Sequence, residues 1–260
     1  MKAFFTIDVE PDLNSTNYKG VQKGIPELLE ILEKNDLKAS FFVTGQTLID
    51  NPKIIRLIQK KGHEIGVHGF SHKRFDILTK KQKQLEIKKS IQVFQKILKK
   101  NPKAFRAPQH SIDSETLEIL EKNNFLYDSS MCSGNLMLLR HLFKKQTNKQ
   151  TILLNFFGKK NPFKIKPNLL EIPRASPLLS LGGFELKAYP KWLIKFIVFQ
   201  YKVFNIPLVF VMHSWDMIEI KNSKTQKLCS QEQFKKRLDF FIKYSKKDFN
   251  YLKLRDIIIK

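Results

Sequence analysis

The chain has 260 residues, of which 42% are hydrophobic, and it carries a formal net charge of +23. This length fits one large domain or two small ones, and the apolar content is sufficient for a sizeable core. No apolar run reaches the roughly 18 residues that a membrane-spanning helix requires. The chain also turns polar at Asp8, too early for a secretory signal, so we expect a cytoplasmic protein.

The positive charge comes mostly from lysine, which outnumbers arginine among the 47 basic residues. Nucleic-acid recognition favours arginine, whose planar guanidinium donates two hydrogen bonds at once, so we do not expect nucleic-acid binding. Solvated lysine faces, or attraction to a lipid carrier or the anionic inner face of a membrane, fit this composition better. Cys132 and Cys229 have neither metal-binding nor redox spacing, so we interpret them as unpaired thiols.

Short β-type runs alternate with stretches that have apolar residues at helical spacing. The predicted strands span residues 3–8, 38–43, 64–68, 104–107, 125–129, 169–174, 207–213 and 251–256. The clearest predicted helices span residues 25–34, 54–61, 82–99 and 114–122, and Asp113 or Ser114 is the expected N-cap of the last. This alternation predicts an α/β fold with a parallel sheet that is closed, or nearly closed, into a barrel.

Two stretches stand out from this alternation. Residues 132–168 are basic and fit no strand–helix unit, so we expect an insertion there within a single domain of residues 1–260. Residues 190–204 predict an amphipathic helix, with Lys191, Lys195 and Lys202 on one face. A barrel helix with a solvated lysine face is the simplest interpretation, and a membrane-surface helix is the alternative.

Chemically active side chains recur where predicted strands end. The residues that close or follow a strand are Asp8, His68, Arg106, Asp128 and His213. Parallel barrels place their active sites at the carboxyl ends of the strands, so we expect these residues to converge on one site.

A divalent metal site is predicted from His68 and His72, four residues apart after an apolar run, together with a nearby carboxylate. Alternate residues of a strand point to the same face, so Asp8 and Glu10 can reach one site together. Asp12 follows the bend at Pro11 and competes with Glu10 for the metal, an alternative that the sequence leaves open.

Five segments occur in a characteristic order along nearly the whole chain. They read TIDVE from Thr6, GHEIGVHGFSH from Gly62, RAP from Arg106, YDSS from Tyr127 and VMH from Val211. Together they resemble the motifs of the polysaccharide deacetylases, the metal-dependent carbohydrate deacetylases of the NodB-homology type. The Asp-x-Glu first motif is similar to that of one branch of this family. The resemblance implies a distorted (β/α) barrel with seven or eight parallel strands.

The resemblance also implies catalytic roles. Asp8 corresponds to the general base and Arg106 to the arginine that keeps it ionised. His213 corresponds to the general acid, and Asp128 is the natural carboxylate to raise its pKa. Structural interpretations remain for three of them: a salt bridge for Arg106, a turn-capping role for Asp128 and a buried, hydrogen-bonded position for His213.

The implied cofactor is one divalent metal held by Glu10, His68 and His72. Two imidazoles and one carboxylate suit zinc, with cobalt, nickel or iron as alternatives. Such a metal lowers the pKa of a bound water and polarises a carbonyl, as amide hydrolysis requires.

The implied substrate is an N-acetylated amino sugar or glycan precursor. Pro108 is expected to bind the substrate, Met212 to line a small pocket for its acetyl group together with Val211, and Trp215 to stack on a sugar ring or simply to pack. The expected activity is therefore metal-dependent N-deacetylation. Hydrolysis of another non-peptide carbon–nitrogen bond is one alternative. A catalytically inactive glycan- or nucleic-acid-binding module is the other, favoured only by the departure of the first motif from two adjacent aspartates.

Overall fold

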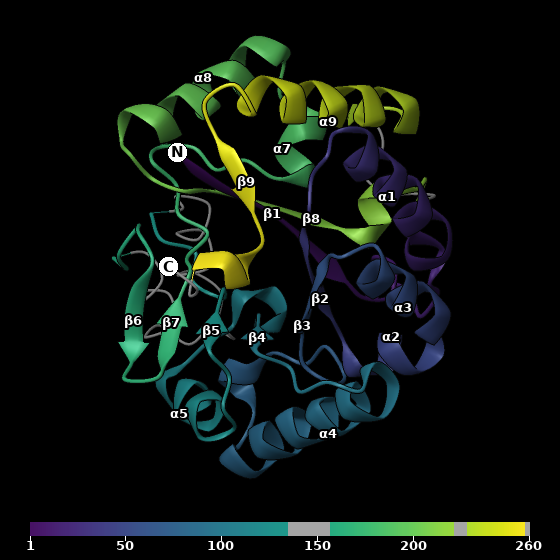
Figure 1. The fold of residues 1–260 in the computed structure, drawn as a ribbon, viewed down its shortest axis with the longest axis vertical. Helices are drawn as coiled ribbons and strands as arrows, with labels where there is room; N and C mark the ends of the chain where they lie inside the picture. Colours follow the sequence, from purple (N-terminus) through teal and green to yellow (C-terminus); the bar gives the residue numbers. More distant parts are fainter. Residues whose placement is uncertain (135–156, 221–227, 258–260) are drawn as a thin grey trace. The chain divides into compact units, whose positions relative to one another are not determined.

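The structure, a computed structural model, describes residues 1–134, 157–220 and 228–257 (Figure 1). The chain divides into two compact units. The first comprises Met1–Phe41, Asn51–Glu64 and Ser180–Lys260, and the second comprises Phe42–Asp50 and Ile65–Leu179. Within the described ranges, no helix is both long enough and apolar enough to cross a bilayer. The single catalytic domain stays a prediction.

In the first unit, strand β1 (Lys2–Val9) pairs in parallel with β8 (Leu208–His213) and with β9 (Asn250–Leu252). After Lys2, every residue of β1 is buried, as expected for a parallel strand that is covered on both faces. The register makes Asp8 and His213 Cα partners. Two predicted active-site residues therefore lie side by side at the carboxyl ends of adjacent strands.

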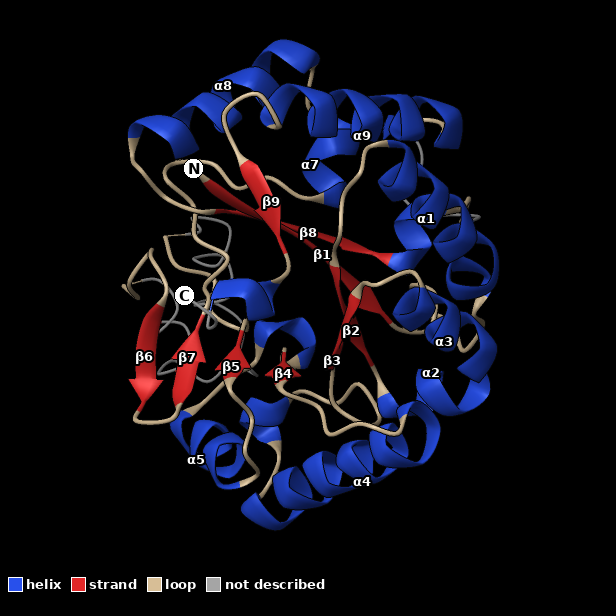
Figure 2. Ribbon diagram, viewed as in Figure 1, coloured by secondary structure: helices blue, strands red, loops and turns tan. Residues whose placement is uncertain are grey.

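Most helices of the first unit bury apolar residues at three-to-four spacing, as amphipathic helices do, whereas the shortest one buries Glu185 and Lys187 beside Leu186. They are α1 (Ile25–Lys34), α3 (Pro52–Lys60), α7 (Gly183–Ala188), α8 (Lys191–Val203) and α9 (Gln231–Ser245). Helices α8 and α9 lie side by side (Figure 2). Short helical turns are η1 (Gly20–Gly24), η5 (Ser214–Met217) and η7 (Leu254–Ile257).

In the second unit, β3 (Glu64–Val67), β4 (Ala104–Phe105), β5 (Tyr127–Asp128) and β7 (Leu169–Glu171) pair in parallel in that order. Strand β6 (Phe163–Lys166) pairs antiparallel with β7. Strands β2 (Ser40–Val43) and β3 begin in the first unit and end in the second. The helical elements are α2 (Gly45–Asp50), η2 (Phe75–Ile77), α4 (Lys80–Leu98), η3 (Pro108–His110) and α5 (Ser114–Lys122).

All eight predicted strands are present, with ends that shift by a few residues, and helices α1 and α5 have the predicted bounds. Asp113 caps α5 as expected, since its carboxylate accepts a hydrogen bond from the Thr116 N–H at 2.8 Å. Strand β6 was not predicted. It lies inside the predicted insertion of residues 132–168, of which residues 135–156 lie outside the described residues. Both cysteines are buried, and neither forms a disulfide in the described ranges.

Candidate active site and metal ligands

The second unit holds the two predicted metal-binding histidines. His68 follows β3, is 2% exposed, and its Nδ1 lies 2.8 Å from the Arg106 backbone oxygen. A carbonyl only accepts, so Nδ1 carries the proton and the Nε2 lone pair is the one available to a metal. The ring centroid of His72 lies 5.2 Å from that of His68. The left-handed backbone of Gly69 (φ 71°) and His72 (φ 59°) turns the loop so that the two imidazoles lie close together.

The loop between these histidines is held by Glu86 of α4. Its carboxylate accepts hydrogen bonds from the backbone N–H groups of Phe70 and Ser71, each at 2.9 Å, and from the Ser71 hydroxyl at 2.7 Å. Glu86 was not predicted from the sequence, because it lies in a lysine-rich helix away from any motif. The available signal was one acidic residue next to Ile87 on the buried face of that helix.

Arg106 follows β4 and is fully buried. Its Nε donates to the Ser129 carbonyl oxygen at 2.9 Å, and its Nη2 donates to the Ser129 hydroxyl at 3.0 Å. The guanidinium carbon lies 4.2 Å from the Phe42 ring centroid. These contacts fix the orientation of the guanidinium. The ion pair with Asp8 stays a prediction.

Asp128 and Glu171 form a buried carboxyl pair at the ends of neighbouring strands β5 and β7, where they are Cα partners. Burial raises the pKa of Asp128 to about 6, although Glu171, Ser130 and Arg106 act in the opposite direction. Burial and the charge of Asp128 raise the pKa of Glu171 well above its usual range. Two neighbouring carboxyl groups that are buried from water cannot both lose their protons without a large cost in free energy. The pair therefore retains a proton near neutral pH.

Replacing Glu171 with glutamine is expected to flatten the dependence of stability on pH. In the unfolded chain these carboxyls ionise near pH 4, whereas the folded pair holds protons to higher pH, so the contribution of this pair to wild-type stability falls as pH rises from about 4 through 6. Glutamine removes one of the two carboxyl groups. The free energy of unfolding of Glu171→Gln relative to that of the wild type should therefore rise by on the order of 2 kcal/mol between pH 4 and pH 8. Urea unfolding across this range measures it, with exposed Glu30→Gln as the control. Parallel curves for wild type and Glu171→Gln would contradict the shared proton.

In the first unit, His213 lies among carboxylates. Its Nε2 is 3.9 Å from Glu10 Oε1 and its Nδ1 is 3.7 Å from Asp216 Oδ2. Burial acts to lower the pKa of His213, but the contact with Asp216 and the charges of Glu10 and Asp8 raise it to about 9. The sequence predicted Asp128 as the carboxylate that raises the pKa of His213. The structure identifies Asp216 as a carboxylate that acts on His213, and the contribution of Asp128 stays a prediction.

Asp216 is itself held by Lys187 of α7. The Lys187 Nζ lies 2.7 Å from Asp216 Oδ1, and both side chains are 4% exposed. Burial raises the pKa of Asp216, but His213 and Lys187 lower it to about 2. A Cβ on Gly183 would lie 2.3 Å from Asp216 Oδ2, which explains the requirement for glycine beside this pair. Neither Asp216 nor Lys187 was predicted, although Asp216 follows His213 by one helical turn.

The three predicted substrate-binding residues have different surroundings. The Trp215 ring stacks on His213, with centroids 4.3 Å apart and planes at 13°, and its Nε1 donates to Glu10 Oε1 at 3.3 Å. One indole face is therefore occupied by the imidazole, so Trp215 helps to position His213 and Glu10. Met212 is fully buried and Pro108 is buried. Contact between these side chains and a substrate stays a prediction.

Two further polar side chains near the motifs have structural contacts. The Asp12 carboxylate accepts hydrogen bonds from the backbone N–H groups of Lys19 and Gly20, both at 2.8 Å, where the chain enters η1. His63 Nδ1 accepts a hydrogen bond from the Ala39 N–H at 3.1 Å. Burial and the nearby lysines lower the pKa of His63 to about 4, so it is neutral and acceptor-capable at physiological pH.

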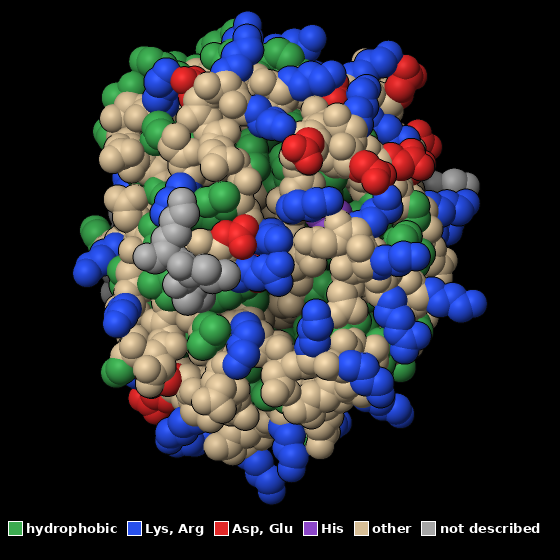
Figure 3. Space-filling view, viewed as in Figure 1, with side chains coloured by type: hydrophobic (Ala, Val, Ile, Leu, Met, Phe, Trp, Pro, Cys, Tyr) green, Lys and Arg blue, Asp and Glu red, His purple; other side chains and the backbone are tan. Residues whose placement is uncertain are grey.

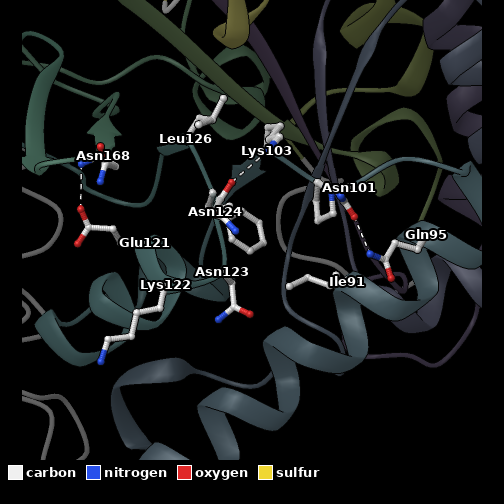
Figure 4. A pocket seen from close by; sticks show the side chains of 12 residues that line it. Ile91, Gln95, Asn101, Lys103, Glu121, Lys122, Asn123, Asn124, Leu126 and Asn168 are labelled. Carbon is white, nitrogen blue, oxygen red and sulfur yellow. Dashed lines mark hydrogen bonds between the residues drawn. The ribbon is translucent and has the colours of Figure 1, made fainter.

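The second unit also contains a pocket of about 510 Å³ lined by several amides (Figure 4). It lies beside Lys103 and Leu126, which precede β4 and β5, and thus at the opposite ends of these strands from Arg106 and Asp128. One of its amides has a structural role: Asn123 follows the last turn of α5, and its side chain donates to the Ile119 carbonyl at 2.8 Å. This pocket is therefore separate from the candidate site.

Comparisons with known proteins bear directly on these motifs. Residues 3–127 match the family model for polysaccharide deacetylase. A peptidoglycan deacetylase from Helicobacter pylori is 32% identical over 121 residues, which are 46% of this chain and 41% of that protein. A peptidoglycan-N-acetylglucosamine deacetylase from Bacillus cereus is 28% identical over 121 residues, with the same coverage of 46% and 41%. The chain therefore spans about two fifths of the length of these relatives.

Solved structures extend the likeness beyond the matched segment. A Mycobacterium smegmatis protein assigned to the polysaccharide deacetylases superposes with a TM-score of 0.69 at 18% identity, over 99% of this chain and 88% of that one. A pseudoenzyme of the CE4 family from Bacillus anthracis gives a TM-score of 0.58 at 15% identity, over 99% and 65%. At such low sequence identities, the superpositions show a shared fold and nothing further. The predicted α/β fold, with its curled and mostly parallel sheet, is confirmed. This chain has the polysaccharide deacetylase fold, and its residues 3–127 match the model of that family.

Proposed function

We propose that this protein is a metal-dependent hydrolase that removes the acetyl group from an N-acetylated amino sugar or glycan precursor. The observation that carries the proposal is the placement of Asp8 beside His213, with Asp216 and Lys187 behind the imidazole. An acid–base pair of this kind is what amide hydrolysis requires. The relatives described as peptidoglycan deacetylases support the N-acetylated glycan as the substrate class.

The proposed cofactor is one divalent metal, with zinc as the first choice. Among the described residues, Glu10, His68 and His72 form a group of side chains that could hold such an ion. Asp12 is the poorer candidate, because both of its carboxylate oxygens already accept backbone N–H groups. Two imidazoles and one carboxylate suit zinc, cobalt, nickel or iron. When bound there, the metal would lower the pKa of a water and polarise the substrate carbonyl.

The remaining steps belong to the protein's own side chains. Asp8 takes a proton from the attacking water, and Arg106, held rigidly by Ser129, keeps Asp8 ionised. His213, whose pKa is raised to about 9, is protonated at neutral pH and donates a proton to the departing amine. Asp216 and Trp215 hold the imidazole in place from two sides.

Asp8→Asn is expected to lower the release of acetate from N-acetylglucosamine oligomers by about 10²–10⁴-fold, the usual contribution of a general base. Acetate is measured enzymatically with the purified, metal-supplemented protein, and the exposed Lys88→Gln serves as the control with wild-type activity. Retained activity in Asp8→Asn would show that another group acts as the base.

The same assay separates the proposal from its two alternatives. Release of ammonia or acid from small amides or imides, with no acetate from the oligomers, would indicate hydrolysis of a different carbon–nitrogen bond. Glycan binding without any hydrolysis would indicate an inactive module, a possibility that the pseudoenzyme of the same fold illustrates. The predicted cytoplasmic location remains part of the proposal and predicts activity in the soluble or inner-membrane fraction of lysed cells.

A further inference from the structure

Helix α8 presents a stripe of large apolar side chains to solvent. Trp192 is 68% exposed, Phe196 47%, Phe199 55% and Val203 59%. They follow one another at intervals of four, three and four residues, which places them on one side of an α-helix. The sequence predicted a lysine face on this helix, with a membrane-surface helix as the alternative, and the structure adds that these apolar side chains are exposed as well.

The opposite side of α8 packs against the rest of the first unit. The side chains buried there are Ile194, Ile197, Val198 and Tyr201. The apolar stripe is thus additional to the face that packs on the first unit. A continuous band of exposed aromatic side chains is uncommon on soluble proteins and marks an interaction surface.

Lysines lie along one flank of the stripe. The Lys191 and Lys195 ammonium groups lie 5.2 and 6.0 Å from the Phe240 ring centroid of α9, and Lys202 pairs with Asp248 at 2.6 Å. Helix α8 contains no acidic residue. Figure 1 places α8 at the upper edge of the molecule. In the same view, Figure 3 shows basic and hydrophobic side chains next to one another along this edge.

We propose that the α8 stripe docks the protein on the surface of an anionic lipid bilayer, which goes beyond the proposed deacetylase activity. Tryptophan and phenylalanine favour the headgroup level of a membrane, and a helix lying in that plane buries its apolar side there. Lys191 and Lys195, whose ammonium groups lie over the Phe240 ring on the flank of the stripe, add positive charge that attracts anionic headgroups. Helix α8 is about 20 Å long at about 1.5 Å per residue, so the whole stripe can lie in the interface at once. A second copy fits less well, because a two-fold contact of α8 with itself brings like-charged lysine rows together.

The test is sedimentation of the full chain with vesicles of phosphatidylcholine alone or of equal parts phosphatidylcholine and phosphatidylglycerol. Wild type is expected to bind the anionic vesicles. Trp192→Ser with Phe199→Ser should bind at least about tenfold more weakly, because two aromatic side chains no longer leave water. Ile77→Ser, at a residue of the second unit that is 64% exposed, should bind as wild type does. Trp192 fluorescence should shift to the blue on binding, and Trp192→Phe should lose that shift while it still sediments.

Several outcomes would overturn the proposal. Equal binding by wild type and the Trp192→Ser, Phe199→Ser variant would show that the net charge of the protein, and not the stripe, causes the binding to vesicles. Absence of binding by wild type would reject the membrane outright. Dimerisation without lipid that the same two substitutions abolish would assign the stripe to a second copy. Circular dichroism confirms that each variant is folded, and acetate release by the same samples tests the deacetylase proposal separately.

Discussion

Lys187→Met is expected to destabilise the protein by about 3 kcal/mol or more, because it removes the nearer of the two cations beside a buried carboxylate, Asp216. The Lys187 and Asp216 side chains are each 4% exposed and their charged atoms are 2.7 Å apart. Methionine replaces the aliphatic stem next to the Phe234 ring, which lies 4.9 Å from the lysine nitrogen. The loss of stability therefore results from removal of the charge rather than from loss of apolar packing. Urea unfolding at neutral pH is the measurement.

A double variant tests whether Lys187 acts through Asp216. Lys187→Met with Asp216→Asn should cost less than the sum of the two single changes, since it removes both charges together. Lys195→Met is the matched control on the exposed side of α8, and its effect should stay within about 0.5 kcal/mol. Strictly additive single and double changes would show that the two side chains do not stabilise each other.

Glu10→Gln is expected to abolish stoichiometric metal binding, with affinity reduced by at least about a hundredfold, more than the loss of an outer-shell partner causes. The glutamine oxygen can still accept the Trp215 Nε1–H bond that Glu10 accepts at 3.3 Å, so the fold should survive. Metal content after dialysis against a mixture of divalent ions, measured by mass spectrometry, gives the answer and also identifies the preferred metal.

Asp12→Asn provides the matched comparison, because it converts the carboxylate that competes with Glu10 for the metal into an amide in the same way. We expect it to keep the metal of the wild type and to lose about 1 kcal/mol of stability, since an amide replaces one acceptor of the Lys19 and Gly20 N–H groups. Loss of metal in Asp12→Asn and retention in Glu10→Gln would reverse the assignment. His68→Ala with His72→Ala should also be metal-free.

The sequence predicted the features that follow from periodicity and strand ends. Apolar runs identified all eight predicted strands, and the rule that parallel strands end at one edge correctly placed Asp8 beside His213. Strand β6 was missed because Phe163-Lys164-Ile165-Lys166 is a short edge strand, with only part of its surface buried. Lysines on such an edge resemble a loop in composition and protect the edge from further pairing.

The contacts behind the catalytic residues could not be predicted, because they join segments far apart along the chain. Lys187 reaches Asp216 from another helix, and Glu86 reaches the Phe70–Ser71 backbone from the interior of α4. Nothing in local spacing distinguishes these two side chains from the many solvated charges around them. Trp215 was recognised as important, but its orientation toward His213 depends on how η5 turns after β8.

The pairing of β1 with β8 has a consequence for synthesis of the protein. Strand β1 leaves the ribosome before two of its partners, because β8 ends at residue 213 and β9 lies later still. At common translation rates, about 10–40 s pass before β8 is made, and during that time the apolar nascent strand has no native neighbour from the C-terminal segment. The second unit, drawn from residues 42–50 and 65–179, can condense earlier. Ribosome-associated chaperones should therefore engage the first forty residues, and a stalled chain that ends before β8 should aggregate.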